Sequence, residues 1–122
     1  MEPYILEFTI PELPPIANTT LYKHWAVKLK IARRWKDLVA LSVYHSKPIQ
    51  PLKRAHLILT RFSSKEPDQD GLISGFKHTI DALVINDIIE DDKPSNLGQV
   101  EYRWRKAPKG KGYITVRVEG EV

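Results

Sequence analysis

Residues 66–92 read EPDQDGLISGFKHTIDALVINDIIEDD and hold the chain's largest concentration of acidic residues. Eight of the protein's fifteen carboxylates lie in this stretch against one base, Lys77, although the whole chain carries a net charge of +4. Like charges that are packed together oppose folding unless a cation joins them. The stretch therefore indicates either a site for a hard metal ion with oxygen ligands or a solvated acidic rim.

The same stretch predicts a helix with one buried face. Its apolar residues follow helical spacing, and they are Leu72, Ile73, Phe76, Ile80, Leu83 and Val84. Asp70, followed by Gly71, suits a helix start because a carboxylate can cap free backbone N–H groups. At 3.6 residues per turn, Lys77 and Asp81 return to the face of Asp70. We therefore expect Asp70, Lys77 and Asp81 to form a polar stripe.

A second acidic group, residues 90–92, follows the end of this helix, so the chain has room to fold back. Asp68, Asp70 and one of the later acids can then converge. Mg²⁺ fits such a cage because it prefers carboxylate oxygens, keeps several waters and shares its shell with substrate phosphate. Lys77 would supply the cation that a phosphodiester transition state also needs.

Residues 19–46 predict a long helix that begins at Thr19 or Thr20. Its apolar face carries Leu21, Trp25, Leu29, Ala32, Val39 and Val43. Its opposite face carries Lys23, Lys28, Lys30, Arg33, Arg34 and Lys36, with no acid among residues 21–36. A solvated helix surface usually mixes both signs to gain pairs one turn apart. We therefore interpret the basic face as a contact surface for a phosphate backbone, with a solvated helix face as the alternative.

Four segments alternate apolar and polar residues and predict strands at residues 4–10, 55–62, 100–104 and 113–118. With the two helices, the element order becomes βαβαββ. We predict an α+β fold: a single domain over residues 1–122 with a mixed four-stranded sheet and both helices packed on one face. The sequence Gly110-Lys111-Gly112 lacks the spacing and the following helix of a P-loop, so no nucleotide cofactor is expected.

Composition narrows the class of protein further. There is no cysteine, which excludes a disulfide framework and a thiolate zinc site. A pI near 9.3 favours a polyanionic partner. The first residues lack a basic leader region, and no apolar run approaches membrane-spanning length. We therefore expect a cytoplasmic protein with no membrane partner.

Short motifs along nearly the whole chain resemble those of one family. They are Pro14-Pro15-x-x-Asn18 before the basic helix, Asp68-x-Asp70, Lys77 followed by Asp81-Ala82-Leu83, Asp91-Asp92, and a Lys-Gly before the final strand. This set resembles the RusA type of Holliday-junction resolvases, small Mg²⁺-dependent endodeoxyribonucleases common in phages and prophages. Two features depart from the family pattern. Gly71 stands where many members carry Asn, and Lys77 lies about one helical turn further from the Asp pair than the lysine of the best-known member does.

The resemblance implies that Asp68, Asp70 and Asp92 hold one or two Mg²⁺ ions, with Asp91 as the alternative third ligand and Mn²⁺ as a substitute metal. Lys77 would steady the scissile phosphate or the attacking water. The implied activity is the resolution of four-way DNA junctions by paired symmetric nicks, in DNA recombination and repair. The implied location is the cytoplasm of a bacterium or of a phage-infected bacterial cell.

Paired cuts need two sites, whereas one chain offers one carboxylate cluster, so we expect a C₂ homodimer. The first strand and the helix that bears Trp25 and Trp35 have apolar side chains for the interface. Two alternatives stay open. One is a fork or flap nuclease, because metal and carboxylates cut phosphodiesters without dictating the branch structure. The other is a catalytically silent DNA-binding protein of the same fold, whose acids serve only as caps and rim.

Overall fold

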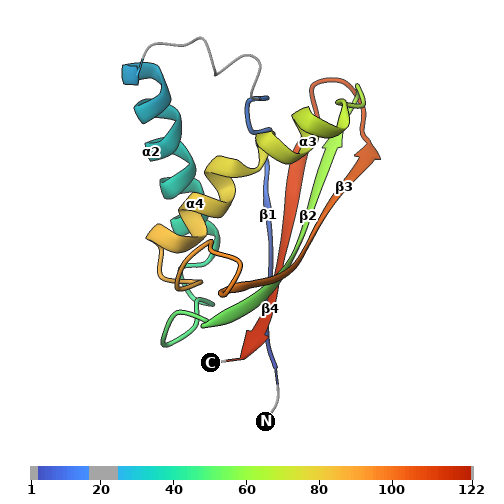
Figure 1. Ribbon diagram of the computed structural model, residues 1–122. Helices are drawn as coiled ribbons and strands as arrows, with labels where there is room; N and C mark the ends of the chain where they lie inside the picture. The colour runs from blue at the N-terminus through green and yellow to red at the C-terminus, as the bar shows by residue number, and fades with distance from the viewer. Residues whose placement is uncertain (1–2, 17–24, 122) are drawn as a thin grey trace.

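A four-stranded mixed sheet forms one layer of the molecule (Figure 1). The computed structural model describes residues 3–16 and 25–121. In the order in which they lie in the sheet, the strands are β1 (Tyr4–Ile10), β4 (Tyr113–Glu121), β2 (Arg54–Ser63) and β3 (Leu97–Lys106). The four strands predicted from alternation are therefore all present, with β2, β3 and β4 longer than expected.

The pairing of the strands explains where the helices lie. β4 pairs antiparallel with both β1 and β2, whereas β2 and β3 are parallel. Parallel neighbours cannot be joined by a tight turn. Here the crossover from β2 to β3 contains two helices, α3 (Gln69–Gly75) and α4 (Lys77–Ile85). Because α3 follows β2 directly, the predicted acidic pair lies close to the end of that strand (Figure 1).

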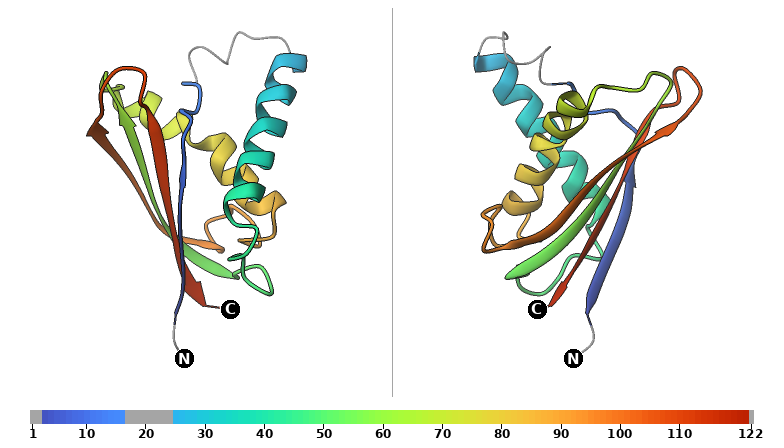
Figure 2. Two further views of the ribbon diagram at one scale, coloured as in Figure 1. Left: turned by 180° about the vertical axis from the view of Figure 1, so that it is seen from behind. Right: turned by 45° about the vertical axis from the view of Figure 1, so that its right-hand side comes forward.

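The helices form a second layer on one face of the sheet. α2 (Trp25–Ser42) packs beside α4, and the two cover the same face (Figure 2). Strand alternation selects this face: Leu6, Leu57 and Val116 are buried beneath the helices, whereas their neighbours Glu7 and Arg117 lie on the opposite face and pair with each other. The α+β fold class, with helices on one face of a mixed sheet, is confirmed.

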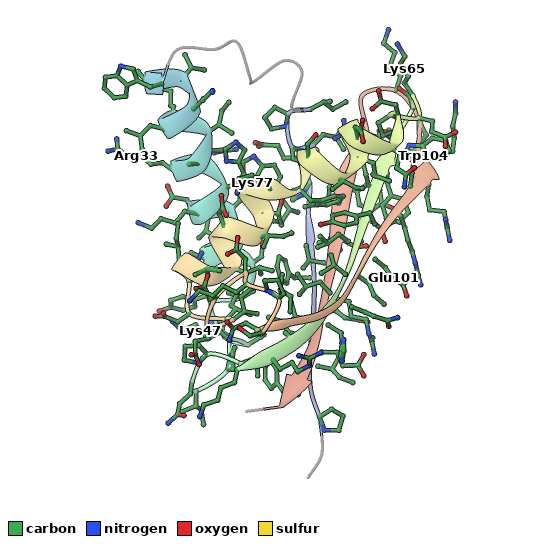
Figure 3. The ribbon with its side chains drawn as sticks, viewed as in Figure 1. Arg33, Lys47, Lys65, Lys77, Glu101 and Trp104 are labelled. Atoms are coloured by element: carbon green, nitrogen blue, oxygen red, sulfur yellow. The ribbon has the colours of Figure 1, made fainter. Side chains whose placement is uncertain are left out.

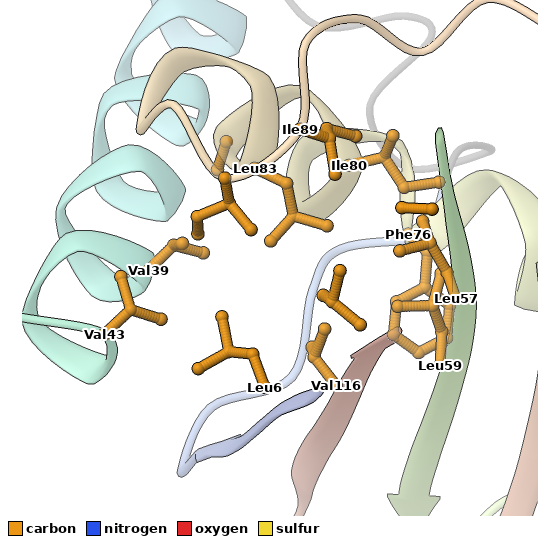
Figure 4. Close-up of a cluster of buried hydrophobic side chains, with 14 of the residues drawn as sticks. Leu6, Val39, Val43, Leu57, Leu59, Phe76, Ile80, Leu83, Ile89 and Val116 are labelled. Carbon is orange, nitrogen blue, oxygen red and sulfur yellow. The ribbon is translucent and has the colours of Figure 1, made fainter. Parts of the chain in front are cut away.

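The hydrophobic core lies between the two layers (Figure 4). It joins five of the elements, with Leu6 from β1, Leu57 and Leu59 from β2, Val116 from β4, Val39 from α2, and Ile80 and Leu83 from α4, and partly buried residues of β3 pack against it. Truncating one such buried leucine to alanine costs about 2–5 kcal/mol. The core therefore fixes α4, which carries Lys77, against the sheet.

The helix predicted from Asp70 onwards is divided in two. α3 ends at Gly75, and Phe76, with φ −91° and ψ 1°, separates it from α4. Glycine weakens a helix by about 1 kcal/mol relative to alanine, and the buried ring of Phe76 gives the break a fixed position in the core. The expectation of one polar stripe is therefore wrong, because Asp70 lies on α3 whereas Lys77 and Asp81 lie on α4.

The buried face of α2 also differs from the prediction. Trp35 and Val39 of α2, and Val43 just beyond it, are buried, but Trp25 is 68% and Leu29 is 42% exposed. The first half of α2 extends past the sheet, so its apolar residues have no strand beneath them (Figure 2). The helix ends at Ser42, four residues earlier than predicted. The predicted cap at Thr19 or Thr20 and the predicted contact of Leu21 lie outside the described residues.

Among residues 3–16 and 25–121, none of the helices combines the length and the apolar composition of a membrane-spanning segment.

Candidate active site

Asp68 and Asp70 lie at the start of α3, and both are exposed. Asp68 is the N-cap residue: its backbone is extended, and its Oδ1 accepts a hydrogen bond of 2.7 Å from the amide of Gly71. Asp70 lies in the first turn, where a negative charge interacts favourably with the free N–H groups. The cap occupies one oxygen of Asp68 and leaves its other oxygen and the carboxylate of Asp70 facing solvent.

The Pro14-Pro15 segment holds α3 in place. A Cβ added at Gly71 would lie 3.1 Å from Cγ2 of Ile16, and one added at Gly75 would lie 3.8 Å from the carbonyl oxygen of Pro15. Gly71 therefore lets this segment pass close to α3, whereas a Cβ at Gly75 would meet Pro15 only at an ordinary van der Waals distance. This gives a physical reason for the glycine at position 71, where a larger side chain would displace Ile16.

Arg61 of β2 anchors the same segment from below. Its side chain is 9% exposed, and its Nη1 donates a hydrogen bond of 2.9 Å to the carbonyl oxygen of Pro14. Burial lowers the pKa of Arg61, because the charged guanidinium has lost water. Sequence reasoning did not identify this residue, although strand alternation through Leu57 and Leu59 places it on the inner face. Arg61 is a positioning residue for the loop that supports the acidic pair.

A pocket of about 300 Å³ lies between the helices and β3. It is lined by Ile73, Ser74, Lys77, Ile80, Asp81, Asp92, Leu97 and Tyr102. Lys77 Nζ lies 3.6 Å from Asp81 Oδ1, one turn further along α4, and the Lys77 side chain is 71% exposed. Such an exposed pair contributes only a few tenths of a kcal/mol, so the ammonium group of Lys77 can turn to another anion at little cost.

The pocket distinguishes between the two adjacent acids. Both carboxylate oxygens of Asp91 contact neighbouring residues: Oδ1 accepts a hydrogen bond of 2.7 Å from the amide of Asp92, and Oδ2 lies 3.5 Å from Lys93 Nζ. The backbone hydrogen bond from Asp92 is the main cause that lowers the pKa of Asp91. Asp92, in contrast, is exposed and lines the pocket with Lys77.

Tyr102 is a further pocket residue that sequence reasoning missed. It lies on the inner face of β3, where its ring is 6.1 Å from that of Phe76, centroid to centroid. Burial raises the pKa of Tyr102. Like any tyrosine hydroxyl, it carries its proton at neutral pH and can donate a hydrogen bond. Alternation with Val100 and Trp104 predicts that it faces the helices, but only the fold shows that it faces Lys77 and Asp92.

The structure brings together part of the predicted site. Lys77, Asp81 and Asp92 share the pocket, whereas Asp68 and Asp70 lie at the opposite end of α3, a seven-residue helix of about 10 Å. Within residues 3–16 and 25–121, no three His, Asp or Glu side chains gather into a metal-binding group. The exposed oxygens of Asp68 and Asp70 still fit Mg²⁺, which commonly binds through one or two carboxylates and completes its shell with water and phosphate.

The predicted basic surface is present on α2, where Lys28, Lys30, Arg33, Arg34 and Lys36 are all exposed. Arg34 forms an ion pair with Glu12: its Nη2 donates a hydrogen bond of 2.7 Å to Oε1 of Glu12, and this hydrogen bond raises the pKa of Arg34. Figure 3 shows Arg33 on α2 and Lys77 where α3 meets α4. Lys23 lies outside the described residues.

Comparison of the chain with protein-family models and with curated protein sequences finds no significant match.

Proposed function

We propose that this protein is a Mg²⁺-dependent endodeoxyribonuclease that resolves four-way DNA junctions. The observation that carries the proposal is the pocket in which Lys77 and Asp92, from separate parts of the chain, lie beside the helix that begins with Asp68 and Asp70. Carboxylates and a mobile cation beside an exposed basic helix are the groups that phosphodiester cleavage requires.

Each residue has a distinct role in this proposal. Asp68, Asp70 and Asp92 would hold Mg²⁺, or Mn²⁺ in its place, after a movement that brings Asp92 toward the start of α3. The metal supplies the charge that activates water and stabilises the leaving oxygen. Lys77 pairs with a non-bridging oxygen of the scissile phosphate, which lies where negative charge develops. The basic residues of α2 hold the backbone of a DNA arm.

A homodimer is part of the proposal, because resolution of a junction needs two cuts. Some apolar side chains on α2 and just after it are exposed and available for such an interface, and they are Val27, Leu29, Leu41 and Tyr44. The first strand and the helix both use part of their apolar surface in the core, where Leu6 and Trp35 are buried. Sedimentation at micromolar concentration should report about twice the chain mass of 14.1 kDa.

The test is cleavage of a labelled synthetic four-way junction, with Asp70→Asn compared to Asp87→Asn. Both substitutions remove one exposed carboxylate, but Asp87 lies beyond α4 with φ 59°, a conformation that asparagine also accepts. Asp70→Asn should abolish cleavage and keep junction binding, whereas Asp87→Asn should cleave as wild type does. Equal cleavage by both variants would remove Asp70 from the site.

Lys77→Ala should lower the cleavage rate by about 10²-fold or more with little change in affinity. The Lys77 side chain is 71% exposed and forms one weak ion pair. DNA binding would therefore lose one cation among many, whereas the reaction would lose the only cation that lines the described pocket. A variant that binds less tightly but cleaves bound junction at the wild-type rate would contradict this role.

A second candidate function is DNA binding without catalysis. The separation of the acidic pair from Asp92 favours it, because the arrangement of the described residues needs a movement before three carboxylates can share a metal. The junction assay separates the two candidates, since a silent protein binds the junction and leaves it intact. A fork or flap nuclease would cut those substrates in preference to the junction.

A further inference from the structure

A second basic surface lies at the end of the sheet where β2 and β3 end. We call it the strand-end basic cluster, and it consists of Lys65, Arg105, Lys106, Lys109 and Lys111, all of them exposed. The chain contains no acid among residues 102–118. Figure 3 shows Lys65 and Trp104 at this end of the sheet, on the side of α3 and α4 away from Arg33.

The loop that joins β3 to β4 has a defined shape. The amide of Lys111 donates a hydrogen bond of 3.1 Å to the carbonyl of Pro108, and Gly110 has φ 81°, the conformation that a type II turn needs at its third position. The amide of Ala107 donates a hydrogen bond of 3.0 Å to the carbonyl of Ser63 in β2. The turn therefore presents Lys109 and Lys111 from a backbone that is tied to the sheet.

Aromatic packing stiffens the base of the cluster. The rings of Phe62 on β2 and Tyr113 on β4 are stacked, with centroids 4.3 Å apart and planes within 9°. On the other face of the sheet, the indole N–H of Trp104 donates a hydrogen bond of 2.9 Å to Ser63 Oγ. These contacts anchor the strand ends below the cations, so little ordering is required when an anion binds.

The charges of the cluster are not balanced within the described part of the protein. None of its five residues forms an ion pair there, whereas the neighbouring Arg103 and Arg117 pair with Glu101 and Glu7. β3 is an edge strand, and cations on an edge can serve to prevent strand-to-strand aggregation. That explanation does not cover Lys109 and Lys111, which lie in the loop beyond the strand.

We propose that the strand-end basic cluster binds the phosphate backbone of DNA. A dense set of cations, none of which has an ion-pair partner among the described residues, complements a polyanion. The cluster also lies at the same end of the sheet as the start of α3, because Asp68 follows Ser63 of β2 by only five positions. DNA held there would pass over the acidic pair, so the assignment of DNA as the occupant rests on the proposed function.

The test compares Lys109→Ala/Lys111→Ala with Lys47→Ala/Lys53→Ala in the full chain. Both double variants remove two exposed lysines, but Lys47 lies at the opposite end of the molecule (Figure 3). Fluorescence anisotropy with labelled duplex and four-way junction DNA in EDTA measures binding without cleavage. The slope of log affinity against log salt should become shallower by about 1 for each phosphate group that the protein no longer neutralises. The expected change is up to about 2 for the loop variant and none for the control.

Equal slopes for the loop variant and the control would overturn this proposal, as would a wild-type protein that binds neither DNA. Aggregation of the loop variant with an unchanged slope would also overturn it, because these lysines would then limit self-association and not hold DNA. Cleavage is measured separately with Mg²⁺. If the wild-type protein cleaves junctions and the loop variant keeps the wild-type salt slope, only the DNA-binding role of the strand-end basic cluster is refuted. If the loop variant has a shallower slope but the wild-type protein never cleaves, only the nuclease assignment is refuted.

Discussion

Substitution of the two glycines of α3 tests whether the segment of residues 14–16 fixes the position of the acidic pair. A Cβ at Gly71 would lie 2.7 Å from Asp68 Oδ1 and 3.1 Å from Ile16, so both must move. A Cβ at Gly75 would have Pro15 as its nearest neighbour, at an ordinary 3.8 Å. The two alanine variants add the same methyl group to the same helix and should change stability in opposite directions.

For Gly71→Ala, loss of the Asp68 cap costs about 1 kcal/mol and overpacking against Ile16 costs about 1–3 kcal/mol. Better helix propensity returns about 1 kcal/mol. The free energy of unfolding should therefore fall by about 1–3 kcal/mol. For Gly75→Ala, only the propensity gain applies, so the free energy of unfolding should rise by about 0.5–1 kcal/mol.

Urea denaturation of both variants and the wild type measures these differences, and junction cleavage by the same samples follows the position of Asp68. Gly71→Ala should cleave more slowly because the Asp68 carboxylate has moved, whereas Gly75→Ala should retain activity. A Gly71→Ala protein as stable as the wild type, or two variants that shift in the same direction, would refute this role of residues 14–16.

Three further predictions follow from individual contacts. Asp92→Asn should reduce junction cleavage by about 100-fold or more, whereas Asp91→Asn, whose carboxylate is occupied by its own neighbours, should retain more activity; the reverse order would exchange their roles. Arg33→Ala should flatten the salt dependence of DNA binding more than Arg34→Ala, because Arg34 is paired with Glu12; equal slopes in anisotropy titrations would contradict this. Burial lowers the pKa of His78, so the folded protein favours the neutral ring. The unfolded chain takes up the proton near its ordinary pKa of 6.5, so stability should be full above that pH and fall as the pH drops toward the lowered pKa of the folded state. In denaturation between about pH 5 and 8, a range that spans this titration, His78→Gln should lose less stability than the wild type does, and an identical loss would exclude the effect.

The sequence predicted the sheet well because strand alternation is a local signal. Residues 4–10 alternate from Tyr4 to Ile10, and the structure has β1 over the same residues. The order of the strands and the path of α2 depend on contacts between distant segments. Trp25 and Leu29 follow a helical apolar pattern, but the sheet does not reach beneath them, and periodicity cannot reveal this.

The candidate site was predicted only in part for the same reason. Asp92 reaches the pocket because residues 88–90 are bound to Leu52. The amide of Leu52 donates a hydrogen bond of 2.9 Å to the carbonyl of Ile88, and the amide of Glu90 donates one of 2.9 Å to the carbonyl of Leu52. This pairing joins segments more than thirty residues apart and leaves no local pattern in the sequence. The break at Phe76, in contrast, is indicated in the sequence by Gly75, because glycine weakens a helix. The spacing of the apolar residues alone does not reveal it.

The most direct test of the proposed function is single-turnover cleavage of a four-way junction in Mg²⁺ and in EDTA, with every strand mapped. We predict paired nicks at positions related by two-fold symmetry in two strands, only when Mg²⁺ or Mn²⁺ is present. A junction that is fully bound in Mg²⁺ but intact on all four strands would contradict the assignment of Asp68, Asp70, Asp92 and Lys77 as a nuclease site.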